Sequence, residues 1–285
     1  MTLRRLLILL TMLSLTGCGD VTFFPSTNGN NNGGSAATPT LTAAFTPKAV
    51  QGGIAIPNLN FTITNATGNP AQTGLGFTAN LPVGLSISGA VTASQCGGTV
   101  TNIGGTQIVF SGGSLTAGTA SCNVSVPLTT QQFTGTSGTD IFRLFTTTAA
   151  DVSAITGSLQ NSLTTQTLTT YPVSVQDSTG KVIATNVGIL TCVQNATDTT
   201  KLDCTIQYDA SNSNTFDVTT LNVTAVAVDK SGNDLPETSV TFVNGAVAAG
   251  TTTAATVGQN VVITLPTSDP TSNIDFWRIL TVAVL

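Results

Sequence analysis

Short stretches in which apolar and polar residues alternate make up most of the chain beyond residue 40. Leu59, Phe61 and Ile63 alternate with polar neighbours, and the run from Cys122 to Leu128 has its apolar residues at one parity. A period of two is typical of β-strands with one buried and one solvated face. Gly, Pro and Asn separate these runs and favour turns. The pattern predicts an all-β protein built from β-sandwiches.

One segment departs from this alternation. Thr148–Asp151 has the form of a helix capping box, with Asp in place of Glu. Val152, Ile155, Leu159 and Leu163 then fall on one face of a helix. We therefore expect one short helix in the second half of the chain.

Charged residues are few and unevenly placed, and they suggest how the chain is divided. They make up 7% of the sequence, against about 25% in typical soluble proteins. Between Cys18 and Thr139 only Asp20 and Lys48 are charged. The other twelve acids and five bases follow this span, and Arg4 and Arg5 precede it. The shift predicts a first sandwich at 40–130, a connector at 131–139 and a second sandwich at 140–285. With so few bases, we expect no nucleic-acid partner.

Missing residue types exclude several kinds of catalysis and metal binding. The chain has no histidine, which removes the commonest general base near neutral pH and all histidine metal sites. Asp229, Ser231 and Asn233 have the spacing of oxygen ligands in a calcium loop, but no bidentate acid follows, so a hairpin turn is favoured. Asp198 and Asp203 are close in sequence without forming a recognisable acid pair for catalysis. We expect no enzyme activity, no metal and no cofactor.

The N-terminus has the features of an export signal. Arg4 and Arg5 precede an apolar run that ends at Leu15-Thr16-Gly17-Cys18. This order resembles the lipobox of bacterial lipoproteins. The resemblance implies that 1–17 is a signal peptide removed before Cys18, whose thiol becomes lipidated and anchors the protein in the membrane. It also implies sorting to the outer membrane in a host with two membranes, because Gly19 rather than Asp follows the cysteine.

A flexible linker and a recognisable domain follow the anchor. Residues 18–39 combine the lipidated cysteine with a linker rich in Gly, Asn and Ser. Six blocks then occur in an order that resembles a bacterial surface-repeat family of immunoglobulin-like domains of unassigned function: Ala44–Pro47, Leu59–Asn65, Gly76–Leu85, Cys96–Val100, Ser111–Leu115 and Ser121–Val126. The resemblance implies an immunoglobulin-like sandwich with a Cys96–Cys122 disulfide. Both cysteines also flank strand runs in an exported chain, where disulfides persist.

Further predictions concern the second sandwich. Cys192 and Cys204 stand near the facing ends of two predicted strands, and we expect them to form a second disulfide. The region from Val223 to Phe242 looks like the closing hairpin of other bacterial immunoglobulin-like repeats. The apolar run from Ile274 to Leu285 is expected to be a final strand in its own sheet, because an exposed apolar edge would pair with other chains.

Together these features predict a lipid-anchored protein of the cell envelope with a structural or adhesive, non-catalytic role. Its expected partners are the membrane, through the anchor, and envelope or surface proteins or glycans. A specific binding module for a glycan, small ligand or protein is the alternative, which exposed aromatic residues around Tyr208, Phe216 or Trp277 would favour. A more remote alternative is a fibre subunit that donates its last strand to a neighbour. Low charge predicts contacts that depend weakly on salt.

Overall fold

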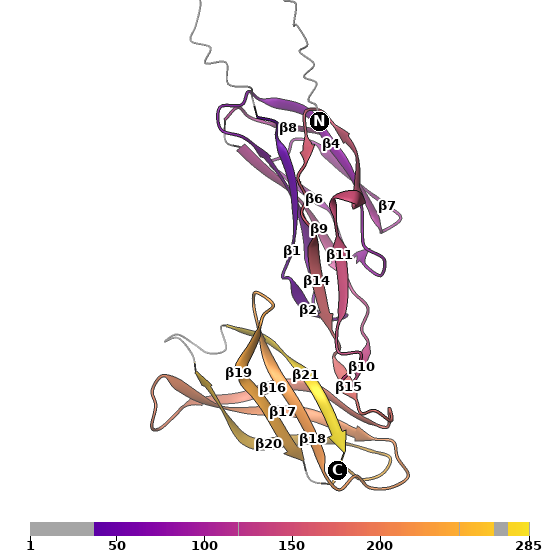
Figure 1. Ribbon diagram of the computed structural model, residues 1–285, viewed down its shortest axis with the longest axis vertical. Coiled ribbons are helices and arrows are strands. Elements are labelled where there is room, and N and C mark those ends of the chain that lie inside the picture. Colours follow the sequence, from indigo (N-terminus) through magenta and orange to yellow (C-terminus); the bar gives the residue numbers. More distant parts are fainter. Residues whose placement is uncertain (1–36, 119, 245, 265–272, 285) are drawn as a thin grey trace, which may run out of the picture. The chain divides into compact units, whose positions relative to one another are not determined.

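The computed structural model describes residues 37–118, 120–244, 246–264 and 273–284, and it is built almost entirely from β-strands (Figure 1). The predicted all-β class is confirmed. The predicted lipidation site Cys18 lies outside the described residues. Within the described ranges, no helix has the length and apolar character needed to cross a membrane.

Three sheets surround a first hydrophobic core, which we define as the buried cluster with members from Leu41 to Leu168. One sheet has the order β13-β1-β3-β9-β5, with β6 also paired to β9; a second has the order β12-β4-β8-β7; a third has the order β11-β14-β2. The bounds are β1 (Thr40–Thr46), β2 (Ala49–Gln51), β3 (Asn58–Asn65), β4 (Gln72–Asn80), β5 (Ser86–Ile87), β6 (Thr92–Ser94), β7 (Thr99–Ile103), β8 (Gln107–Leu115), β9 (Ala120–Thr129), β11 (Arg143–Thr147), β12 (Val152–Thr156), β13 (Gln160–Asn161) and β14 (Gln166–Tyr171).

The predicted alternation forms this core directly. The apolar parity of β3 is buried, as is that of β9, while the residues between them keep contact with solvent. Three phenylalanines from three strands form the centre of the packing. The ring of Phe77 lies 5.0 Å from that of Phe61 and 5.6 Å from that of Phe110, measured between centroids. Such tilted aromatic pairs add to the stabilisation from buried area.

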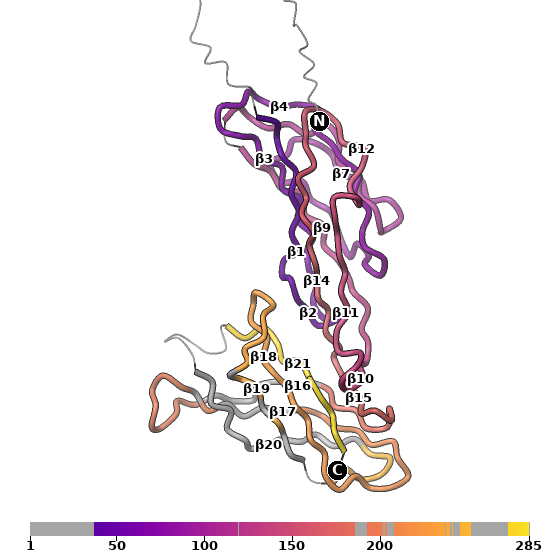
Figure 2. Tube along the Cα trace, viewed as in Figure 1, coloured from indigo at the N-terminus to yellow at the C-terminus, as the bar shows by residue number. Residues whose placement is uncertain are grey.

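The strands between 143 and 171 pair with strands from the beginning of the chain. β12 is antiparallel to β4, β13 is parallel to β1, and β14 is parallel to β2. In Figure 2 this magenta part of the Cα trace runs beside the indigo strands. The first core therefore continues to Leu168, well past the boundary that the charge pattern places near residue 139. The division into tandem domains stays a prediction.

The predicted helix at Val152–Leu163 is wrong. The capping box itself forms: the backbone N–H of Thr148 donates to the Asp151 carboxylate at 2.7 Å, and the Thr148 hydroxyl donates to it at 3.0 Å. It caps only a short 3-10 helix, η1 (Ala149–Asp151), after which β12 begins. Pairing with β4 provides backbone partners that a helix would otherwise provide, and Gly157 turns the chain with φ of +70°.

Two further sheets surround a second hydrophobic core, which we define as the buried cluster with members from Val175 to Val282. Their orders are β10-β15-β16-β17-β20 and β19-β18-β21. The bounds are β10 (Thr134–Thr136), β15 (Ser174–Gln176), β16 (Val182–Gln194), β17 (Lys201–Asn212), β18 (Leu221–Asp229), β19 (Asp234–Asn244), β20 (Thr251–Thr264) and β21 (Ile274–Val284).

The last strand and the connector both join sheets of the second core. β21 pairs antiparallel with β18 from Ile274 to Val284, as expected for a final strand in its own sheet. β10 comes from the predicted connector and runs parallel to β15. The chain therefore enters a sheet of the second core at β10, returns to the first core through β11–β14, and enters the second core again at β15.

Candidate functional site

The outer surface of β1, β3, β6 and β9 presents rows of uncharged polar side chains. Register pairs place Thr42, Thr62, Asn123 and Ser94 in one row across the four strands. The adjoining row contains Ala44, Asn60, Ser125 and Thr92. We call this surface the hydroxyl–amide face, and define it by the outward residues Thr40, Thr42, Ala44, Thr46, Asn58, Asn60, Thr62, Thr64, Thr92, Ser94, Ser121, Asn123 and Ser125. No residue of this set carries a charge.

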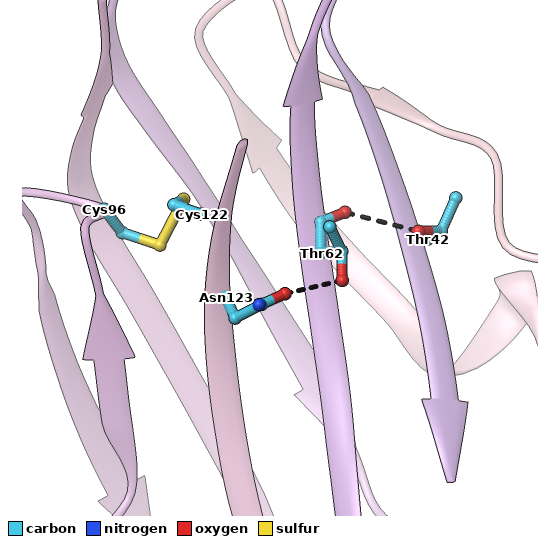
Figure 3. Close-up of a disulfide and its surroundings, with 5 residues drawn as sticks. All are labelled: Thr42, Thr62, Cys96, Cys122 and Asn123. Atoms are coloured by element: carbon cyan, nitrogen blue, oxygen red, sulfur yellow. Dashed lines mark hydrogen bonds between the residues drawn. A yellow bond between two sulfur atoms is a disulfide. The ribbon is translucent and has the colours of Figure 1, made fainter. Parts of the chain in front are cut away.

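Hydrogen bonds link neighbouring strands across this face (Figure 3). The hydroxyl of Thr42 donates to the backbone carbonyl of Thr62 at 3.4 Å, and the hydroxyl of Thr62 donates to Oδ1 of Asn123 at 2.6 Å. Neighbouring strands in a sheet lie about 4.8 Å apart, and outward residues on one strand about 6.6 Å apart. The face is therefore a regular array of donors and acceptors with both spacings set by the backbone.

A disulfide lies on the inner side of this sheet. Cys96 is bonded to Cys122, with 5.0 Å between their Cα atoms, so the pairing that the family resemblance implies is present. Their side chains are 0% and 3% exposed. Cys96 follows β6 and precedes β7, where the chain passes from one sheet to the other, and its carbonyl accepts a hydrogen bond from Ser114 N–H at 2.7 Å. The bond attaches this crossing segment to β9.

A pocket of about 770 Å³ opens beside the disulfide. Its lining comes from the start of β4, the end of β8, the start of β9 and the segment around Cys96. The lining residues are Ala71, Gln72, Thr73, Gln95, Gly97, Ser114, Leu115, Thr116, Ala120 and Ser121, and none of these is charged or aromatic. Ser121 also belongs to the hydroxyl–amide face, so pocket and face are continuous.

The second predicted disulfide has matching backbone positions. Cys192 on β16 and Cys204 on β17 are register partners in an antiparallel pair. Directly opposed residues of such a pair have Cα separations of about 4.5–5.5 Å, which lie within the range that a disulfide spans. The bond itself stays a prediction.

Two of the three aromatic residues whose exposure would favour a ligand site in the second half are buried. Tyr208 is fully buried, and Trp277 is 3% exposed, because both pack in the second core. Burial raises the pKa of Tyr208 to about 12. Of the three predicted residues only Phe216 is exposed, at 63%. Tyr208 and Trp277 therefore give no support to the binding-module alternative: they supply the large side chains of a core otherwise rich in Val and Ala.

The Asp229–Asn233 segment forms the expected turn. One oxygen of the Asp229 carboxylate accepts from the backbone N–H groups of Ser231 and Asn233, each at 2.8 Å. Burial raises the pKa of Asp229, but the hydrogen bonds from Asn233, Ser231 and Gly232 outweigh it and hold that pKa below its ordinary value. The carboxylate thus caps its own turn. In the described ranges no group of three or more acids or cysteines is arranged to hold a metal.

A similar turn connects β15 and β16. The Asp177 carboxylate accepts from the backbone N–H groups of Lys181 at 3.0 Å and Val182 at 3.1 Å, and from the hydroxyl of Thr179 at 2.7 Å. Burial raises the pKa of Asp177, but these hydrogen bonds outweigh that effect and the pKa lies below its ordinary value. Asp177 therefore has a structural role in the hairpin.

Asp198 and Asp203 each pair with a nearby base or amide. Asp198 is paired with Lys201 at 3.2 Å, and Asp203 accepts from the Asn195 amide at 3.1 Å. The two carboxylates therefore have separate partners. Each carboxylate binds groups of its own turn or strand end.

The sequence alone predicts neither the hydroxyl–amide face nor the pocket. The sequence does indicate that an outer polar surface exists, because polar residues alternate with the apolar residues that predict the core on the same strands. The sequence does not give the order of the strands in the sheet. β9 pairs with β3, which comes from a distant part of the chain, and this pairing brings their polar residues together. The pocket depends on where the β6–β7 segment lies against β4 and β8, which alternation does not encode.

Comparison with known proteins gives a partial family match and distant structural likenesses. Residues 39–139 match a family described as a domain of unknown function, DUF7933. No curated protein matches the chain. Among solved structures, the chain is similar to BcpA, the major pilin subunit of Bacillus cereus, with 14% identity and a TM-score of 0.32 over 76% of this chain and 55% of that one. A variant of the same pilin gives 13% identity and a TM-score of 0.33 over 80% and 67% of the two chains. The chain thus spans about half the length of the first pilin structure.

Proposed function

We propose that this is a lipid-anchored protein of the cell envelope that acts by contact, as a structural or adhesive module, and that the hydroxyl–amide face is its contact surface. The observation that carries the proposal is the regular, uncharged array on β1, β3, β6 and β9. Hydroxyl and amide groups both donate and accept hydrogen bonds, so such an array suits a neutral polar partner rather than an ionic one. The anchor is proposed from Cys18 and the residues before it.

A binding assay with matched variants tests the contact surface. The mature chain with Cys18→Ser is incubated with isolated envelope fractions, and bound protein is measured at low and high salt. We expect binding to change less than about twofold with salt, because few ionic contacts are available for screening. Thr62→Lys places a charge at the centre of the face and should reduce binding at least tenfold.

Thr101→Lys is the matched control, since Thr101 is an exposed threonine on β7 in the other sheet. It should leave binding unchanged, and far-UV circular dichroism should show that both variants are folded. Equal effects of the two substitutions, or binding that disappears at high salt, would refute the proposed surface.

The anchor has its own test. Metabolic palmitate labelling should mark the wild-type protein and not the Cys18→Ala variant, and the variant should be released from the membrane fraction. Protease treatment of intact cells then determines which side of the envelope the chain faces. Absence of label on the wild type would refute the lipid anchor while leaving the contact surface testable.

A further inference from the structure

The pocket beside the disulfide has the properties of a small-ligand site. Its volume of about 770 Å³ lies within the range of known small-molecule sites. Ala71 and Ala120 provide apolar contact, and hydroxyl and amide side chains provide the polar groups. The combination suits a ligand with apolar carbon–hydrogen surface and several hydroxyl groups, and the uncharged lining disfavours an ion.

Several polar side chains of the pocket are available to such a ligand, among them those of Thr73, Gln95 and Ser121. Among the residues that the structure describes, the side chains of Thr73, Gln95 and Ser121 have no hydrogen-bond partner, whereas Gln72 is engaged by Ser158. Two hydroxyls and one amide can together donate and accept on several sides of a ligand. These groups lie on three different segments of the chain: Thr73 on β4, Gln95 after β6 and Ser121 on β9.

Gln95 is held in a conformation that side chains rarely adopt. Its φ is +61°, in the left-handed region that favours glycine, and the Cys96–Cys122 bond follows directly after it. Left-handed residues other than Gly, Asn and Asp are uncommon and cluster at functional sites. Glycine adopts this conformation without strain, so Gln95→Gly removes the amide without straining the backbone.

We propose that this pocket binds a neutral sugar at the end of a glycan chain. Sugar hydroxyls would pair with Gln95, Thr73 and Ser121, and the carbon face of the ring would lie on Ala71 and Ala120. Since Ser121 is shared with the hydroxyl–amide face, the rest of the glycan can continue along that face. The inference rests on the proposed contact function and specifies the partner as an uncharged polysaccharide.

Calorimetric titration of the mature chain with defined oligosaccharides tests this inference. The neutral probes are six-residue oligomers of glucose, galactose, mannose and N-acetylglucosamine, and the anionic probe is a galacturonate oligomer of equal length. At least one neutral probe should bind more tightly than the anionic one. Gln95→Gly should weaken that binding at least fivefold while leaving the urea midpoint equal or higher, because glycine adopts the positive φ without strain.

Two further variants complete the test. Ser121→Trp should abolish binding by filling the pocket mouth, and Thr101→Ala, which removes an exposed hydroxyl from the other sheet, should have no effect. Binding to none of the neutral probes, preference for galacturonate, or insensitivity to both Gln95→Gly and Ser121→Trp would overturn the inference. If envelope binding still depends on Thr62 in that case, the proposed contact function stands without a sugar pocket. Loss of both kinds of binding would remove both proposals.

Discussion

Removing the Cys96–Cys122 bond should cost a large part of the stability of the first core. The bond closes a loop between residues that are 26 positions apart, and the loop-entropy relation gives about 3.5 kcal/mol at 25 °C for that length. Whole domains are typically stable by about 5–15 kcal/mol. Few ion pairs support this part of the chain, so the loss should be easy to measure.

Urea unfolding of the mature chain, followed by far-UV circular dichroism, measures this effect. A Cys192→Ala/Cys204→Ala background confines any reductant effect to the Cys96–Cys122 bond. In that background, reductant should lower the free energy of unfolding by about 3.5 kcal/mol. Adding Cys96→Ala and Cys122→Ala should lower it by at least as much, since both side chains are buried.

A small difference in the free energy of unfolding between the oxidised and reduced chains would refute this reasoning. If reduction changes the free energy of unfolding by less than about 1 kcal/mol, the entropic argument fails for this loop. A reduced chain that keeps its urea midpoint would also show that β6 and β9 hold the crossing segment without the covalent bond.

Two other predictions concern packing and pH. Phe77→Ala should lower the free energy of unfolding, measured with urea, by about 3–5 kcal/mol. The reason is that the ring is buried between those of Phe61 and Phe110. A loss below about 1 kcal/mol would contradict the described packing. The folded-state pKa of Asp177 lies below its ordinary value of 3.8, so its ionised form stabilises the fold above that pH and the contribution is lost as pH falls through the lower folded-state pKa. The urea midpoint of wild type should therefore fall more steeply below about pH 4 than that of Asp177→Asn, and parallel curves would refute the role of this carboxylate.

The alternation of apolar and polar residues predicted individual strands well, but it did not predict which strands pair with each other. Alternation at Leu59–Ile63 and Cys122–Leu128 matches β3 and β9 because burying one parity is a property of each strand by itself. The alternation of Tyr171, Val173 and Val175 would by itself predict one strand, but β14 ends at Tyr171 and β15 begins at Ser174. Pro172 lies between them and cannot donate to a ladder, so the chain changes sheets there.

The candidate site was less predictable than the fold. The Cys96–Cys122 pairing was reachable from the family resemblance, while the helix from Val152 was wrong because pairing with β4 overrode a weak helical pattern. Tyr208 and Trp277 could not be assigned to core or surface from composition. Predicting the hydroxyl–amide face and the pocket requires the order of strands in the sheets, which depends on contacts between distant parts of the chain.

The exchange of strands between the two cores constrains how evolution or an engineer can shuffle this protein. A gene fragment ending near codon 139 would encode β10, which completes a sheet of the second core, yet it would omit Val152 and Leu168, which fill the first. The complementary fragment, from residue 140 onward, would begin with β11–β14, which pack in the first core or pair with its strands. Modular recombination of the first sandwich should therefore succeed only when the transferred segment extends to Tyr171.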